Sequence, residues 1–372
     1  MSRVLAAVGL LTVFFGVFLA ILFVRPGVSA EPAGPTPVKL SSKLPAWVAP
    51  GVRVAVSGFA GAHQLVRARL SGHSSGVVRS GRLGGFRLVV IAPRPGRYAV
   101  SVSSGGTVVK AGVLRVRPVL LAAVGDVTTG EQVGASVSTL GSDYAWARVG
   151  ATLRAADVAT ANLEGAVSSR GVAVANNHSG DYGAEALLDT IRFAHAAGIQ
   201  TVGGGSNAAA ALRPVIVTVG GLRIGFVGLS DVNPYGFNAT ADSPGTAKAD
   251  PDTVRSAVRA ARRVSDVVVC WFHWGTELHP DPSERQRELA AAAFAAGAQV
   301  VLGAHPHVFG AVSSPVRGSV VAWTLGNFVF PSGSPDTERT GILAVSLDRY
   351  GVRGWRVEHA TIHGFQPQLD RG

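Results

Sequence analysis

Two histidines stand one residue apart at the end of an apolar run. The run 299–302 is followed by Gly303-Ala304-His305-Pro306-His307-Val308. Such a run is typical of a buried strand, and alternate side chains of an extended chain point the same way. We therefore expect the imidazoles of His305 and His307 to face one spot. A pair of this kind could bind a metal, take part in acid–base catalysis or lie on an ordinary surface.

Four other apolar runs also end in residues that can bind metal ions. They are 119–125 before Asp126, 158–161 before Asn162-Leu163-Glu164, 172–175 before Asn176-Asn177-His178, and 267–272 before His273. Open α/β sheets bind their ligands at the carboxyl ends of the strands. Five runs that end in this way predict one site at one edge of a sheet. For Asp126 and Asn162, strand-end capping is the alternative.

The elements that must position these residues begin near residue 119, where strand runs alternate with helical patterns. This alternation of strands and helices predicts an α/β fold. Apolar residues share one face over 187–194 and 254–261, the spacing of amphipathic helices packed on a sheet. Gly220-Gly221 predicts a hairpin over 214–229. Late strands are expected over 320–330, 342–347 and 355–362, with a frayed end after them.

The N-terminal segment differs in composition from the rest of the 372 residues. An uninterrupted apolar run, 4–24, is long enough to span a bilayer, and Val28-Ser29-Ala30 fits a small-residue cleavage site. We interpret 1–30 as a signal peptide or a membrane anchor, and we expect an exported, extracytoplasmic chain, either membrane-anchored or secreted. The Pro-rich stretch 31–45 predicts a linker without structure of its own.

Residues 46–118 consist of short alternating runs separated by Gly, Pro and Ser clusters, which predicts a small antiparallel β-sandwich, immunoglobulin-like in type. Between residues 32 and 125 there are 13 Lys and Arg and no Asp or Glu, in a chain of net charge +11. This asymmetry indicates either adhesion to a polyanion, such as anionic lipid, a cell-wall polymer or a capsule, or an Arg-rich background without function. Nucleic acid is disfavoured, because an exported chain without an aromatic and basic platform has little access to it.

Six motifs, in order, resemble those of the CapA family, which is named for poly-γ-glutamate capsule synthesis and is similar in fold to calcineurin-like metallophosphoesterases. They are Gly125-Asp126-Val127, Asn162-Leu163-Glu164, Asn176-Asn177-His178 with Asp181-Tyr182-Gly183, His273-Trp274-Gly275-Thr276-Glu277, Gly303 to Val308 and Leu325-Gly326-Asn327-Phe328. The resemblance covers roughly 119–350. It implies a metallophosphoesterase-like α/β/α sandwich over 119–372.

The resemblance also implies a cage for two divalent ions. It assigns Asp126 and His307 to the first ion, Glu164 to a bridge between the ions, Asn177, His273 and His305 to the second ion, His178 to a general acid or substrate contact, and Asn162, Asp181, Glu277 and Asn327 to substrate binding. A mixed set of oxygen and imidazole ligands suits Mn, Fe or Zn. Two ions roughly 3.5–4 Å apart can bind the attacking and leaving oxygens of a displacement together.

Two departures from the family pattern concern this site. Thr128 stands where the wider pattern has a histidine, which leaves the first ion with fewer protein ligands. Only 11 residues, Gly165 to Ala175, separate two motifs between which family members carry a longer segment with a helix. One wall of the cleft is therefore expected to be reduced.

Two classes of function follow. The first is an exported, metal-dependent hydrolase of phosphoester or amide bonds in the synthesis of capsular poly-γ-glutamate or a related anionic polymer. The second is a non-catalytic, anion-binding component of a polymer assembly or export machine, working with other capsule-synthesis proteins at the membrane or cell wall. The retained histidine motifs favour the first class, whereas Thr128 and the short segment favour the second.

Overall fold

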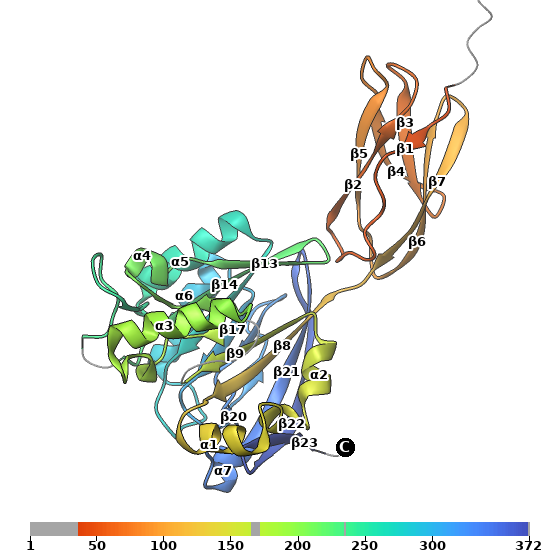
Figure 1. Cartoon of the computed structure of the whole chain (residues 1–372). Coiled ribbons are helices and arrows are strands. Elements are labelled where there is room, and N and C mark those ends of the chain that lie inside the picture. The colour runs from red at the N-terminus through yellow and green to blue at the C-terminus, as the bar shows by residue number, and fades with distance from the viewer. Residues whose placement is uncertain (1–35, 165–171, 234–235, 371–372) are drawn as a thin grey trace, which may run out of the picture.

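The computed structural model describes residues 36–164, 172–233 and 236–370. An all-β part at the N-terminal end is joined to a larger α/β part by a short connection at Arg117 and Pro118 (Figure 1). None of the helices in the described residues is long and apolar enough to cross a membrane. The predicted leader, 1–30, lies outside the described residues, so export stays a prediction.

Two antiparallel sheets make up the all-β part. One has the order β1 (Lys39–Leu40), β2 (Arg53–Phe59) and β5 (Gly85–Ile91); the other has the order β4 (His73–Arg79), β3 (Leu65–Leu70), β6 (Gly96–Ser104) and β7 (Thr107–Val116). In β3 buried and exposed residues alternate, because one face of the sheet meets the other sheet and the second face meets water. Strand β1 lies within the stretch predicted as an unstructured linker, so that stretch is partly ordered. The immunoglobulin-like type and the domain boundaries stay predictions.

The first sheet of the α/β part mixes parallel and antiparallel neighbours. Its order is β11 (Thr201–Val202), β10 (Val172–Ala173), β9 (Val158–Leu163), β8 (Val119–Val127), β21 (Arg339–Asp348), β22 (Gly351–His363) and β23 (Gln366–Leu369), with β20 (Asn327–Val329) also beside β8. Strands β8 to β11 run parallel, so their carboxyl ends lie at one edge.

The second sheet has six strands. Its order is β13 (Val215–Val219), β14 (Leu222–Ser230), β16 (Val267–His273), β17 (Val300–Ala304), β19 (Val320–Ala322) and β18 (Val312–Ser313). Strands β14, β16, β17 and β19 are parallel, and β13 with β14 forms the expected hairpin. Cys270 is fully buried in β16, and burial raises the pKa of its thiol.

The two sheets pack face to face, with helices outside both. Helices α1 (Glu131–Leu140), α2 (Gly150–Ala155) and α3 (Gly183–Ala196) cover the first sheet, while α5 (Pro251–Val264) and α6 (Glu284–Ala296) cover the second (Figure 1). The α/β class is confirmed, but there are four layers rather than the three of an α/β/α sandwich. Strand runs buried on both faces do not reveal whether a helix or a second sheet covers each face.

Residues 366–369 form a further strand, where the sequence predicts a frayed segment. Strand β23 pairs antiparallel with β22, from Ala360 opposite Leu369 to His363 opposite Gln366. Gly364 and Phe365 have φ of 54° and 64° and form the tight turn between the two strands. Alternation in a four-residue strand after such a turn is too short a signal to be read from sequence.

The junction between the all-β and α/β parts is built around Arg117. Its guanidinium donates two hydrogen bonds of 2.7 Å to the Asp157 carboxylate and lies 3.6 Å above the Trp47 ring. Next to it, the Ala49 N–H donates to the Gly220 carbonyl at 2.8 Å. Burial alone would raise the pKa of Asp157, but the hydrogen bonds from Arg117 and from the Leu120 N–H outweigh it and lower the pKa.

Replacing Asp157 with Asn should lower the free energy of unfolding by about 1 kcal/mol, because a bidentate ion pair loses its charge. The folded-state pKa of Asp157 lies below its unfolded value of about 3.9, so this stabilisation is complete above the unfolded pKa and is lost as pH falls through the folded pKa. Urea unfolding of both proteins should therefore show a larger difference near neutral pH than at about pH 2. Asp189→Asn, which removes an exposed pair with Arg192, is the control and should have little effect. A pH-independent difference for Asp157→Asn would contradict the assignment.

Candidate metal centre

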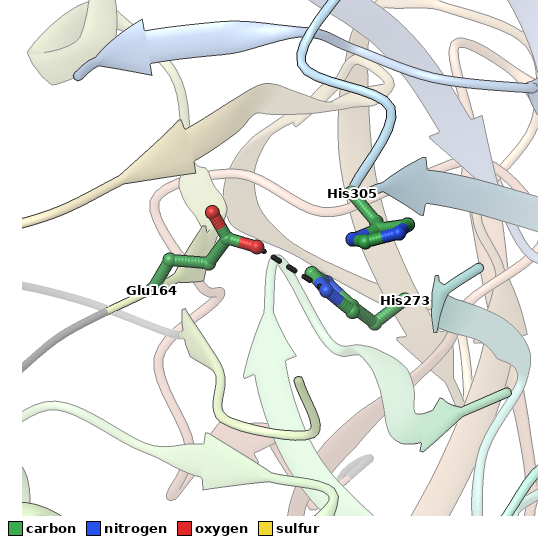
Figure 2. A group of neighbouring side chains, drawn as sticks. All are labelled: Glu164, His273 and His305. Atoms are coloured by element: carbon green, nitrogen blue, oxygen red, sulfur yellow. Dashed lines mark ion pairs between the residues drawn. The ribbon is translucent and has the colours of Figure 1, made fainter. Parts of the chain in front are cut away.

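The predicted ligands gather where the carboxyl ends of the two sheets meet. Asp126 lies near the end of β8 and Glu164 directly follows β9, both in the first sheet. His273 ends β16 and His305 directly follows β17, both in the second sheet. Figure 2 shows Glu164 reaching from one side toward His273 and His305 on the other. The site therefore lies between two sheets rather than along the edge of one.

The two histidines of the His-Pro-His motif converge for a reason other than the predicted one. Strand β17 ends at Ala304, and His305 and His307 have φ of 95° and 60°, so the chain is not extended there. The turn brings their ring centroids to 6.1 Å. Positive φ costs a residue with a side chain about 1–3 kcal/mol, and such strain is concentrated at functional sites. The prediction that both rings face one site holds, but the strand alternation invoked for it is wrong.

Asp126, Glu164 and His307 form a first group of candidate ligand atoms within 4.8 Å of one another. His307 Nδ1 lies 3.5 Å from Asp126 Oδ2 and 3.9 Å from Glu164 Oε2. Thr128 contributes no ligand to this group: its hydroxyl accepts a hydrogen bond from the Gly130 N–H and holds the turn after β8. That the first position has fewer protein ligands stays a prediction.

Glu164, His273 and His305 form a second group, whose ligand atoms also lie within 4.8 Å of one another. His273 Nε2 lies 3.2 Å from Glu164 Oε1 and 2.7 Å from Asn177 Oδ1. Three predicted ligands of the second ion therefore converge on one point. Glu164 belongs to both groups, which is the arrangement that a bridging carboxylate requires.

The buried charges of this pocket favour the binding of a cation. Both carboxylate oxygens of Glu164 and the Nδ1 atom of His305 are buried without a hydrogen-bond partner. Burial, reinforced by the negative charge of Asp126, raises the pKa of Glu164 well above its usual value, and burial raises that of Asp126 too. Burial also lowers the pKa of His273 strongly and that of His305 to about 4, so both imidazoles are neutral and able to act as ligands. Buried carboxylates without donors are costly unless a cation pairs with them, and the oxygen and imidazole set fits Mn, Fe or Zn.

Two asparagines predicted to bind substrate are instead packed behind the ligands. Asn162 is 1% exposed and donates to Asp126 Oδ1 at 2.8 Å. Asn327 is equally buried, and its amide nitrogen donates to Ser332 and to the Thr337 carbonyl. Its Oδ1 lies 2.9 Å from His307 Nδ1 and so helps to orient the imidazole ring. The geometry favours positioning roles for both residues. The residue type alone does not distinguish such a role from substrate binding.

His178 and Asp181 form a pair at the solvent side of the site. His178 Nδ1 lies 2.9 Å from Asp181 Oδ2, and both side chains are about half exposed. His178 is close enough to affect the pKa of Asp126, His273 and His305 by its charge. It belongs to none of the three candidate ligand groups found in the described residues, which is consistent with the predicted acid or substrate contact.

Glu277 lies closer to the ligands than its predicted role in substrate binding required. Its exposed carboxylate forms a third group with His305 and His307, within 4.8 Å. Its negative charge also acts on the pKa of Glu164 and His305. Glu277 can therefore supply an oxygen ligand beside His305 and His307.

Comparison with known proteins shows which family the chain resembles. Residues 166–332 match the family described as bacterial capsule synthesis protein PGA_cap. The PGA biosynthesis protein CapA of Bacillus subtilis (strain 168) is 34% identical over 194 residues, which are 52% of this chain and 51% of that protein. The capsule biosynthesis protein CapA of Bacillus anthracis is 31% identical over 263 residues, 62% of this chain and 64% of that protein. The resemblance to the CapA family is confirmed.

The chain spans less than two thirds of the length of either CapA protein, so what those proteins do as a whole is carried over only as a proposal. A probable polyglutamine synthesis accessory protein of Mycobacterium tuberculosis (strain ATCC 25618 / H37Rv) is 38% identical over 115 residues, 28% of this chain and 30% of that protein. A 5'-nucleotidase precursor of Thermus thermophilus aligns in structure over 68% of this chain and 56% of its own, at 16% identity and a TM-score of 0.38. That TM-score is too low to support a conclusion about this chain.

Replacing Glu164 with Gln should lower the metal content of the purified protein, because the carboxylate that both ligand groups share loses its charge. His178→Asn should keep the metal content near that of the wild type, since His178 belongs to neither group. Elemental analysis after loading with Mn and dialysis measures both. Loss of metal from His178→Asn equal to the loss from Glu164→Gln would make His178 a ligand and overturn the assignment.

Glu277→Gln should weaken the affinity for Mn without abolishing binding, because Glu277 adds one exposed oxygen to a group of ligands that is mostly buried. Isothermal titration with Mn gives the dissociation constant, and a loss of about tenfold is the expected scale for one such contact. Glu284→Gln, an exposed change in the first turn of α6, is the matched control. An unchanged dissociation constant in Glu277→Gln would leave Glu277 only the predicted contact with substrate.

Proposed function

We propose that this chain is a CapA-like protein of capsule or polyglutamate synthesis that binds divalent metal between its two sheets and hydrolyses a phosphoester or an amide bond of an anionic polymer. The names of its relatives support the process, and the site supports the reaction class. The observation that carries the proposal is Glu164, whose two buried oxygens lack donors and face imidazoles from the opposite sheet.

The chain's own residues have distinct tasks in this proposal. Asp126 with His307, and Asn177 with His273 and His305, hold two positions, and Glu164 is shared between them. Divalent ions bound there would supply Lewis acidity to the attacking and leaving oxygens. Asn162 and Asn327 hold Asp126 and His307 in place from behind, so that the ligands keep their geometry when substrate binds.

His178 acts as the proton donor in this proposal. Asp181 accepts a hydrogen bond from His178 Nδ1–H, which fixes the orientation of the ring and leaves Nε2 free to contact substrate. In this orientation His178 Nε2 can hold a proton and give it to the leaving group as the bond to the polymer breaks. The half-exposed position of the pair fits a group that meets a substrate arriving from solvent.

The second candidate is a non-catalytic component that grips an anionic polymer. Thr128 favours it, because the first ion position has few protein ligands. The same motifs would then bind polymer carboxylates, with or without metal, and no bond would be broken. The two candidates differ in turnover and not in the architecture of the site.

Purified full chain loaded with Mn or Zn should hydrolyse at least one member of a panel of phosphomonoesters, phosphodiesters and γ-glutamyl amides, and a chelator should stop it. His178→Asn should lower the rate roughly 10²–10⁴-fold while metal stays bound, the typical loss when a general acid is removed. Asn233→Ala, which changes a side chain in the loop after β14, is a control for purification and loading. No turnover with any substrate, together with retained polymer binding, would replace the hydrolase by the non-catalytic candidate.

A further inference from the structure

One face of the all-β part carries a concentrated positive charge. On the sheet β4-β3-β6-β7, outward positions hold six exposed cations without a single acid: Arg67, Arg69, Arg79, Arg97, Lys110 and Arg115. Residues 32–125 contain no Asp or Glu, so neighbours in this part cannot neutralise them. Arg117, the basic residue paired with a carboxylate here, lies at the junction and not on this face.

Strand register sets how these cations are spaced. Arg69 and Lys110 stand on either side of Ser101 in one row across three strands, and Arg67 stands beside Ser103 in the next row. From Ser103 to Arg97 is six residues along β6, which is about 20 Å. The face is therefore a strip of Arg, Lys and Ser side chains, with the exposed Val77, Val108 and Val113 among them, and it is as long as several monomers of a linear polymer.

The positive charges of Arg97 and Arg115 repel each other when no anion is bound to the strip. They are directly opposite each other in antiparallel register, with Cβ atoms about 5 Å apart, and like charges in such a pair destabilise a sheet. No carboxylate in this part of the chain relieves the repulsion. An anion bound between the two guanidinium groups would relieve it, and the planar fork of Arg suits carboxylate oxygens.

We propose that this face binds a linear polycarboxylate and holds the chain on it. A lipid surface fits less well, because the outward positions of these strands carry no aromatic side chain of the kind that anchors proteins at a bilayer interface. Tyr98, the aromatic residue of these four strands, pairs with the fully buried Leu114 and faces inward. The repeated positive charge along the strip matches a flexible polymer with repeated carboxylates.

The face is remote from the metal centre. Strand β8 starts at Val119 beside the all-β part and reaches Asp126 seven residues later, about 23 Å away. Polymer held on the basic face therefore leaves the metal centre open to another stretch of polymer or to another substrate. This binding function is independent of the proposed hydrolysis, so either can fail without the other.

The test compares two fourfold variants of the full chain that remove the same charge from the same part. Arg67, Arg69, Arg97 and Arg115 are changed to Gln on the basic face; Arg53, Arg82, Arg87 and Arg94, all exposed, are changed to Gln elsewhere. Binding to immobilised poly-γ-glutamate is measured with chelator present and over a range of salt concentrations. The face variant should bind at least about tenfold more weakly and with a shallower salt dependence, whereas the control variant should stay within about threefold of wild type.

Three outcomes would overturn the proposal. Equal losses in both variants would mean that net charge alone acts. Binding that disappears in Glu164→Gln would place the polymer at the metal centre. Binding of wild type to phosphatidylglycerol vesicles, lost in the face variant, with no binding to poly-γ-glutamate, would make the partner a membrane.

Folding is checked by thermal melting followed by circular dichroism. The double variant Arg97→Gln with Arg115→Gln should melt no lower than wild type, since it removes a repulsive pair, and it should still lose affinity for poly-γ-glutamate. It keeps the test decisive if the fourfold variant does not fold.

Discussion

The site depends on one constraint: Glu164 and Asp126 are buried carboxylates that lie close together without a charged partner to balance both of them. Their own hydrogen bonds do not neutralise them, since Glu164 accepts none and Asp126 accepts only from an amide and a backbone N–H. Burial keeps His273 and His305 unprotonated, so these histidines cannot act as the counter-charge. A cation between the two sheets resolves both problems, because carboxylates and neutral imidazoles then become ligands.

The two-sheet architecture is what makes such a pocket possible. Parallel strands in each sheet direct their carboxyl ends to the same side, and packing the sheets face to face brings one set of acids opposite one set of histidines. Register fixes the detail: Asp126 lies beside Asn162 on neighbouring strands of one sheet, and His273 lies beside Ala304, next to His305, in the other. A shift of one residue in either sheet would turn a ligand away from the pocket.

Much of this could be predicted from the sequence, and the failures have identifiable causes. Strand-end residues could be found because a buried apolar run ending in Asp, Asn or His is a local pattern. The packing of a second sheet on the first could not be predicted, because a buried residue such as Val124 or Val268 can be covered by a helix or by another sheet. The bend at His305 was missed because positive φ in a residue with a side chain is set by tertiary contacts. The roles of Asn162 and Asn327 depend on which atoms lie behind the ligands. The spacing of residues along the chain does not determine this arrangement.

The most direct measurement of the central claim is anomalous X-ray diffraction from crystals of the protein soaked with Mn. The account predicts anomalous density between Glu164 and the imidazoles of His273, His305 and His307, within bonding distance of the Glu164 oxygens. Ordered crystals with full soaking and no anomalous density in this pocket, or density only at surface acids, would contradict it.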